Sequence, residues 1–387
     1  MVDVRDGLAM ESLQQSLREG GPIATSGTHA GANDVSMERV VELAELHEVA
    51  SLFLSRQQAL EFPVAEGLLH RLRSRFERNA RRSLVLSGQL AHLVGLASRS
   101  SLRVMAFKGP MLATVAYENV ALREFSDLDI LVSPQDLPRA KQLLLNEGFM
   151  LRRPLTALQE RWLLESQCEY EFLRSDGVAV DLHWGFTPRY FPYPVDFEQL
   201  WRRRRTVNLG PVAVSTIGNE DLVGVLCAHG AKSGWSKLKW VIDVAHFVKR
   251  HPDLDWDLVQ REAGIAGTAR MVHVGIQLAG DMFGSPVPVS SNEASEKRRS
   301  RELAVGLKAR LLSGPPRDLS PLQMARLQVR LRERLRQRVS VAARVAFLPN
   351  HFDAAAVPVP RQLSFVQYCV RPVRLAVTSL AKQGRRI

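Results

Sequence analysis

Two aspartates, Asp127 and Asp129, are separated by one residue within the apolar stretch DLDILV. Because successive side chains of a strand point to opposite faces, the two carboxylates share one face while Leu128 and Ile130 point into the core. Carboxylates held this close repel each other, and one of them takes up a proton unless a cation lies between them. Carboxylate oxygens suit Mg²⁺, which usually keeps some of its waters and also binds substrate phosphates. The pair therefore predicts a divalent metal site.

A third aspartate, Asp181, lies in the alternating stretch VAVDLHW, and His183 shares its face. If this strand neighbours the first in one sheet, Asp127, Asp129 and Asp181 converge. Three carboxylates can hold two metal ions roughly 3.5–4 Å apart, which clamp the entering and leaving oxygens of a phosphoryl displacement. We therefore predict that the three aspartates are catalytic and bind two Mg²⁺ ions. His183 is expected to orient a carboxylate or to pack beside Trp184.

A glycine corner precedes the first aspartate pair. Lys108 and Gly109 open a predicted helix, where free backbone N–H groups and the helix dipole favour phosphate. Glycine also lets the backbone come close to a ligand. The corner therefore predicts a phosphate contact, although a lysine at the end of a strand is also often simply solvated.

A compact unit of strands and helices must position these residues. Its order of elements predicts a mixed α and β core over residues 100–205, with a hairpin around Ser175-Asp176-Gly177. The predicted elements are a strand over 103–107, a helix over 110–119, a strand over 127–132, a helix over 133–149 and the hairpin over 169–186.

Helical segments flank this core on both sides. In the tail, leucines and arginines form adjacent stripes at a spacing of four, which predicts one amphipathic helix over 321–345. Two helices broken near residues 230–234 are expected after the core. The predicted parts are a helical N-terminal segment over 1–99 with a Gly/Ser/Thr-rich linker at 20–37, the core over 100–205, a helical domain over 206–283 and a basic, helix-rich tail over 284–387 that begins with a polar linker at 284–300.

The basic charge is confined to the tail. The chain has 387 residues and a net charge of +12, but residues 297–387 carry twenty Lys and Arg against four Asp and Glu. The first 296 residues carry 32 basic and 36 acidic groups. The excess of basic charge that is typical of nucleic-acid binding is therefore not distributed over the whole chain. The arginine stripe is expected to be a solvated face or a binding surface for an acidic partner. Three distant cysteines, an acidic N-terminus and the lack of a long apolar run predict a cytoplasmic protein without a transmembrane segment.

The motifs FKG, SDLDILV and VDLHW resemble the nucleotidyltransferase superfamily, and most closely a bacterial family of uncharacterised nucleotidyltransferases with a Lys-Gly corner. The resemblance covers about residues 38–260. It implies an α+β fold with a nucleotidyltransferase-like mixed sheet, and magnesium-dependent transfer of a nucleotide from an NTP to an acceptor with release of pyrophosphate. By position, Asp127 and Asp129 would bind the metals, Asp181 would ligate the catalytic metal and assist deprotonation of the acceptor, and Gly109 would line the triphosphate. The acceptor is left open between a small molecule, a protein and an RNA.

One departure from the superfamily pattern concerns the corner. The superfamily usually has Gly-Gly or Gly-Ser there, whereas this chain has Gly109-Pro110, and proline lacks the N–H and hydroxyl that such a corner offers to phosphate. Arg123 also has a second interpretation as a structural ion pair with Glu124 or Asp127. The candidates for the missing phosphate contacts are Lys108, Arg123 and Ser126.

Two other functions stay open at this point. A metal-dependent glycosyltransferase also uses an Asp-x-Asp pair, but it would bind a sugar nucleotide and would not need Asp181. A non-catalytic module would keep the fold and use the basic tail for binding, with an affinity that falls with salt if the target is a nucleic acid. His229, Lys232 and Trp235 are expected either to approach the nucleotide or to pack in the core, and Asp243 is expected to be a structural hydrogen-bond acceptor.

Overall fold

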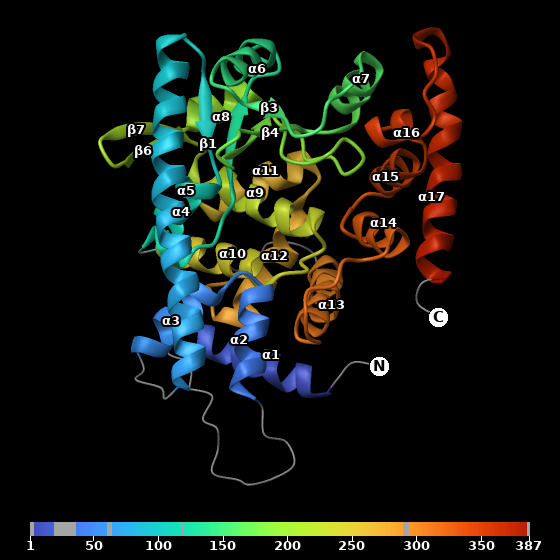
Figure 1. The fold of residues 1–387 in the computed structure, drawn as a ribbon. Coiled ribbons are helices and arrows are strands. Elements are labelled where there is room, and N and C mark those ends of the chain that lie inside the picture. Colours follow the sequence, from blue (N-terminus) through green and yellow to red (C-terminus); the bar gives the residue numbers. More distant parts are fainter. Residues whose placement is uncertain (1–3, 19–35, 60–63, 118, 289–293, 385–387) are drawn as a thin grey trace.

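A mixed five-stranded sheet lies at the centre of the fold (Figure 1). The computed structural model describes residues 4–18, 36–59, 64–117, 119–288 and 294–384. The strand order is β1-β2-β5-β4-β3, in which β2 and β5 are parallel and the other neighbours are antiparallel. The predicted α+β class with a mixed sheet is therefore confirmed. The strands are β1 (Val104–Ala106), β2 (Asp127–Val132), β3 (Met150–Leu151), β4 (Glu169–Leu173) and β5 (Ala179–His183).

The two faces of the sheet differ because the strands alternate. Leu128 and Ile130 enter an apolar cluster with α4 (Glu66–Arg99) and α6 (Leu137–Asn146). Asp129 points to the opposite face, the same side as Leu131, which packs into the cluster of the helical layer. Only one face of β2 is therefore fully apolar.

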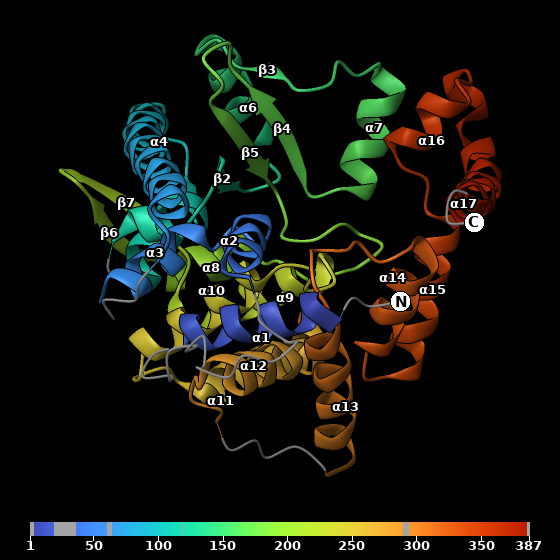
Figure 2. The same ribbon diagram turned by 60° about the horizontal axis from the view of Figure 1, so that its bottom comes forward.

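The helical layer faces the carboxylate side of the sheet. The predicted break is found, since Trp235 has a φ of 52° and its N–H donates to the carbonyl of Gly230 at 2.7 Å. Figure 2 shows this layer lying along one side of the sheet. The layer consists of α9 (Asn219–Lys232), α10 (Leu238–Arg250), α11 (Trp256–Ala266) and α12 (Ala269–Phe283). The short α5 (Gly109–Ala116) joins β1 to β2 and packs against α10.

A second hairpin was not predicted. It consists of β6 (Arg205–Leu209) and β7 (Val212–Thr216), which turn at Gly210 with a φ of 61°. Val214 of this hairpin joins the apolar cluster of the sheet, and β7 contacts β1. The hairpin therefore extends the core beyond its β1 side.

The N-terminal segment is helical, as predicted. Most of the predicted linker over 20–37 lies outside the described residues, and Ser36 stands at the N-cap of α2 without a side-chain capping bond. The segment consists of α1 (Val4–Leu17), α2 (Met37–Leu46), α3 (Ala50–Ala59) and the long α4. In the described part of the chain, each helix is too short or too polar to cross a membrane.

The tail folds into separate helices, which corrects two predictions. The expected continuous helix over 321–345 is broken at residues 331–334, so that Leu331 is fully buried whereas Leu335 is 74% exposed. The expected polar linker at 284–300 is partly helical. The tail helices are α13 (Ala294–Leu311), α14 (Pro321–Arg330), α15 (Leu335–Phe347), α16 (His351–Ala356) and α17 (Gln367–Gly384). We call α14 to α17 the arm; it stands beside the β4 side of the sheet, where α16 contacts α7 (Ala157–Ser166) (Figures 1 and 2).

Candidate active site

Asp129 and Asp181 occupy paired positions in the register of the parallel strands β2 and β5. Their side chains therefore project from the same face of the sheet, toward the helical layer. Asp129, Asp181 and His183 each offer a ligand atom, and these three atoms lie within 4.8 Å of one another. β2 and β5 are thus neighbours in one sheet, as the predicted convergence of the carboxylates requires.

Asp127 lies on the same face, two residues before Asp129 and opposite Ala179. It does not belong to the group of ligand atoms within 4.8 Å, as far as the described residues show. It is nevertheless electrostatically close, because burial and the charge of Asp129 raise its pKa. Burial likewise raises the pKa of Asp181 to about 7, and the charges of Asp129 and Asp127 act in the same direction against the opposing effect of His183.

Asp129 is the carboxylate that already has cationic neighbours. Lys108 forms an ion pair with its Oδ1, and Nε2 of His183 lies 3.1 Å from the same oxygen. Burial alone would raise the pKa of Asp129, but Lys108 and His183 outweigh burial and hold it well below its usual range. Asp129 is therefore ionised, whereas no ion pair with Asp127 or Asp181 is found among the described residues.

His183 connects Asp129 to two residues farther along the sheet. Its Nδ1 lies 3.1 Å from Oε2 of Glu169, an ion-pair contact whose angle is too poor for a hydrogen bond, and Nζ of Lys232 lies 3.3 Å from Oε1 of Glu169. Burial would lower the pKa of His183, but Glu169 and Asp129 raise it well above its usual value. The charges thus alternate along the chain Asp129, His183, Glu169 and Lys232, which we call the charge chain.

Sequence reasoning missed Glu169, although the hairpin contained the signal. Glu169 and His183 are register partners, each seven residues from Asp176 in the turn. Counting outward from the turn therefore pairs them. Lys232 is expected near the nucleotide or in the core, and its contact with Glu169 puts it at the edge of the site.

The glycine corner touches the strand that carries the aspartates. Gly109 has a φ of 51°, and a Cβ built on it would lie 2.8 Å from the carbonyl oxygen of Asp127. Few residues other than glycine adopt this φ, and the contact leaves no room for a side chain. Pro110 occupies the first turn of α5, where it offers no N–H. Gly109 thus holds the corner directly against the start of β2.

Arg123 is held by a different partner from those predicted. Its Nε and Nη2 donate to the two oxygens of Asp243 at 2.8 and 2.9 Å, and the hydroxyl of Tyr117 donates to Asp243 at 2.7 Å. The expected pairing with Glu124 or Asp127 is wrong, because Glu124 pairs with Arg75 at 2.6 Å. The prediction of Asp243 as a structural acceptor is confirmed by these contacts. Nη1 of Arg123 is buried without a hydrogen-bond partner in the described part of the chain.

Ser126 is exposed and lines a cavity of about 640 Å³ at the edge where β2 and β5 begin. Arg78 and Arg82 from α4 also line this cavity, and Nη2 of Arg82 donates to the carbonyl of Ser126 at 3.1 Å. The cavity thus combines arginines and a hydroxyl group with the acidic side chains of Glu124 and Asp176.

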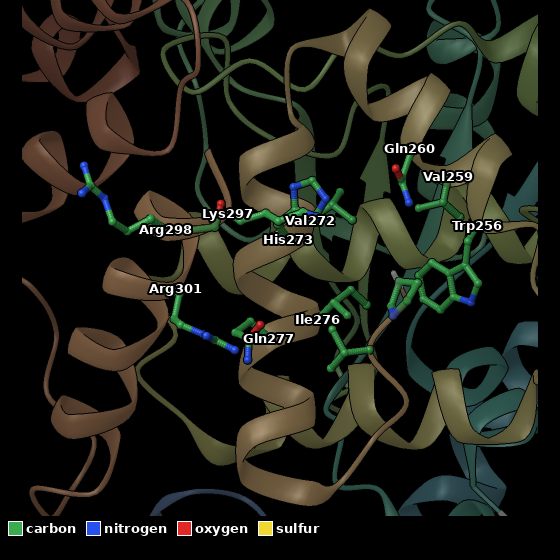
Figure 3. A pocket seen from close by; sticks show the side chains of 13 residues that line it. Trp256, Val259, Gln260, Val272, His273, Ile276, Gln277, Lys297, Arg298 and Arg301 are labelled. Carbon is green, nitrogen blue, oxygen red and sulfur yellow. The ribbon is translucent and has the colours of Figure 1, made fainter. Parts of the chain in front are cut away.

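Another cavity, of about 490 Å³, lies between α11, α12 and α13 (Figure 3). Trp256 and Ile276 form part of its apolar wall, and Lys297 and Arg301 lie at its α13 side. None of its lining residues belongs to the sheet, so it is separate from the carboxylates.

The donors on the sheet face suit a divalent cation. Asp127, Asp129 and Asp181 are oxygen ligands on one surface, and two of them have pKa values raised by burial and by mutual repulsion. A cation between them would remove the repulsion and offset the cost of burying the carboxylates in the ionised form. The buried acidic and histidine groups of this face could therefore bind a metal.

Comparison with known proteins agrees with this geometry. No curated protein and no solved structure matches the chain. The family model described as "Uncharacterised nucleotidyltransferase" matches residues 33–284, which include the corner, the three aspartates, the charge chain and the helical layer. A match over well over half of the chain establishes the relationship, and the chain belongs to this family of nucleotidyltransferases.

Proposed function

We propose that this protein transfers a nucleoside monophosphate from an NTP to a hydroxyl group of an acceptor, with release of pyrophosphate and with two Mg²⁺ ions. The observation that carries the proposal is the register pairing of Asp129 with Asp181 on adjacent parallel strands, with Asp127 on the same face. The family supports nucleotidyl transfer in general. The metal, the donor and the acceptor are our inference from the side chains.

Each aspartate has its own part in the proposal. Asp127 and Asp129 would hold the metal ions, and Asp181 would complete the site. When bound, Mg²⁺ would supply Lewis-acid stabilisation of charge on the phosphoryl oxygens. Asp181, on the same face as the proposed metal ligands, would accept the proton of the acceptor hydroxyl. The acceptor oxygen then bonds to the α-phosphorus, and the bond from that phosphorus to pyrophosphate breaks.

The phosphate contacts are distributed around the corner. Lys108, the cation on Asp129, would bind a phosphate oxygen together with the N–H of Gly109. Ser126 would contact the nucleotide from the cavity lined by Arg78 and Arg82. Of Arg123 only Nη1 is available for a phosphate, because Asp243 occupies the other two nitrogens.

The test is incorporation of label from each [α-³²P]NTP in the presence of Mg²⁺ and a cell extract, with pyrophosphate measured in parallel. We expect Asp129→Asn and Asp181→Asn to abolish both signals while the far-UV circular dichroism spectrum stays unchanged. Asp253→Asn, in the exposed turn before α11, is the control and should leave both signals intact. Full activity of Asp181→Asn with a sugar nucleotide would instead support a glycosyltransferase. The lack of Mg²⁺-dependent turnover with every NTP would favour the non-catalytic module.

A further inference from the structure

A cavity of about 870 Å³ lies between the arm and the body of the protein. Its walls come from α14, α15 and α17, and from Tyr190 and Lys232 of the body. Met324, Val345 and Leu375 are among its apolar residues. The volume falls within the roughly 300–1,000 Å³ of typical small-molecule sites. The cavity therefore has the size and the apolar wall of a binding pocket.

The charged side chains that line this cavity are basic. Lys232, Arg326, Arg330 and Arg371 line it, and among the described residues that line it none is acidic. Arg371 is buried and has its Nη1 3.6 Å from Asp353, and Lys232 contacts Glu169 outside the lining. For Arg326 and Arg330 no ion pair is found within the described ranges of the chain. An anion is therefore the charge-complementary occupant.

Lys232 connects this cavity to the catalytic carboxylates. It lines the cavity and is also the last member of the charge chain, in which Glu169 and His183 lead to Asp129. The cavity between α11, α12 and α13 (Figure 3) has no such connection. Only the side chains of Glu169 and His183 would thus separate Lys232, and an anionic group bound to it, from Asp129.

We propose that this cavity binds the nucleotide acceptor, and that the acceptor is a small organic anion with an apolar body, a carboxylate or phosphate group and a reactive hydroxyl. The inference rests on the proposed nucleotidyl transfer, and its group-transfer step is the one described there. The arm supplies most of the wall and lies beyond residue 284, where the family match ends. The basic tail thereby has a function as the acceptor-binding part of the enzyme.

The first test measures binding by isothermal titration calorimetry with the full chain. The probes are 2-naphthoate and 2-naphthyl phosphate, which distinguish the two kinds of anion, and the neutral 2-naphthalenemethanol. We expect at least one anion to bind 10-fold or more tightly than the neutral probe. Arg330→Glu should weaken anion binding at least 10-fold. Arg336→Glu is the matched control, because Arg336 is exposed on the neighbouring α15 and does not line the cavity.

The proposal is overturned if the three probes bind equally, or if Arg330→Glu and Arg336→Glu have the same effect. The second test repeats the labelling with the cell extract separated into small molecules, protein and RNA. Label should appear in an anionic small molecule, and Arg330→Glu should reduce it at least 10-fold. Label in protein or RNA would also overturn the acceptor assignment. Binding of a fluorescent Mg²⁺–ATP analogue should be unaffected by Arg330→Glu. If wild-type protein binds neither this analogue nor any other NTP, the failure lies with the proposed function.

Discussion

Gly109 lies against the backbone of Asp127, so closely that a Cβ on the glycine would be 2.8 Å from the aspartate carbonyl oxygen. The corner proposed to meet phosphate and the first proposed metal ligand are therefore held at a fixed separation by main-chain contact. Rotation of the Asp127 side chain moves its carboxylate but cannot change the separation of the two backbones. The contact makes the glycine a direct determinant of where β2 begins.

Gly109→Ala should therefore destabilise the protein more than a strained φ alone would. Gly210→Ala is the matched control, because Gly210 has a φ of 61° and a Cβ there meets no atom within 4 Å. We expect roughly 1–2 kcal/mol for the left-handed backbone at either site and about 1–3 kcal/mol more at Gly109 for the overlap. Urea unfolding measures both values. Equal losses would show that the loop simply moves away from Asp127.

Asp181→Asn should stabilise the metal-free protein at alkaline pH. The pKa of Asp181 is raised to about 7 in the folded state, so ionising it costs folding free energy as the pH rises from about 4 to 7. The gain for the asparagine variant should be absent at pH 4 and reach up to about 4 kcal/mol at pH 8. Urea unfolding in EDTA at the two pH values tests this. Asp176→Asn should show no such gain, and a pH-independent effect at Asp181 would contradict the raised pKa of its carboxyl group.

Mg²⁺ should raise the melting temperature of the wild-type protein, and EDTA should reverse the rise. Binding to the folded state alone contributes about 2.7 kcal/mol when the ion is at 100 times its Kd. Asp129→Asn and Asp181→Asn should lose most of this response because each removes one oxygen ligand. Differential scanning calorimetry at several Mg²⁺ concentrations provides the measurement. A response that survives in both variants would place the ion elsewhere.

Glu169→Gln should lower nucleotide transfer about 10- to 100-fold, which is typical when a residue that orients a ligand loses its charge. Glu169 holds His183, and His183 in turn contacts Asp129. Glu302→Gln is the control, since Glu302 is exposed on α13 and pairs with Arg298 at 3.7 Å, away from the sheet. ¹⁵N NMR titration of His183 should show a lower pKa in Glu169→Gln only. An unchanged imidazole pKa would remove Glu169 from this role.

Arg123→Met should cost about 3–5 kcal/mol, because Asp243 would stay buried without its counterion. The double variant Arg123→Met/Asp243→Leu should recover much of the loss, since neither charge remains to be compensated. Urea unfolding of the single and double variants gives the coupling energy. A loss that is the same in the double variant would mean that shape, rather than charge, determines the effect.

The local geometry of the site could be predicted from the sequence, whereas its contacts between distant segments could not. Alternation placed Asp127, Asp129 and Asp181 on the polar faces of their strands, and the turn at Asp176 fixed the hairpin. Counting outward from the turn at Asp176 would also have paired Glu169 with His183. The approach of Asp243 to Arg123 depends on how α10 packs on the sheet, which no local pattern contains.

The tail shows how tertiary contacts override a helical pattern. The stripe predicted one helix, but Arg332 turns inward, where Nη2 donates to the carbonyl of Pro192 at 2.7 Å and Nη1 to that of Gly267 at 3.3 Å. Glu333 accepts a bond from the N–H of Arg270 at 2.8 Å. These bonds to distant backbone break the helix at residues 331–334 and decide which leucines are buried. For the hairpin of β6 and β7, by contrast, alternation on both sides of Gly210 was a local signal that was overlooked.

The bond between Arg123 and Asp243 also limits how the molecule can move during turnover. It joins the loop before β2 to α10. To open a hinge between them, the two charges would first have to separate inside the protein, before water could reach either of them. A hinge opening between α10 and the loop before β2 is therefore energetically costly. The proposed nucleotide would therefore bind without a hinge opening between α10 and the loop before β2, and discrimination between substrates would depend on the fit of the site instead of on its closure.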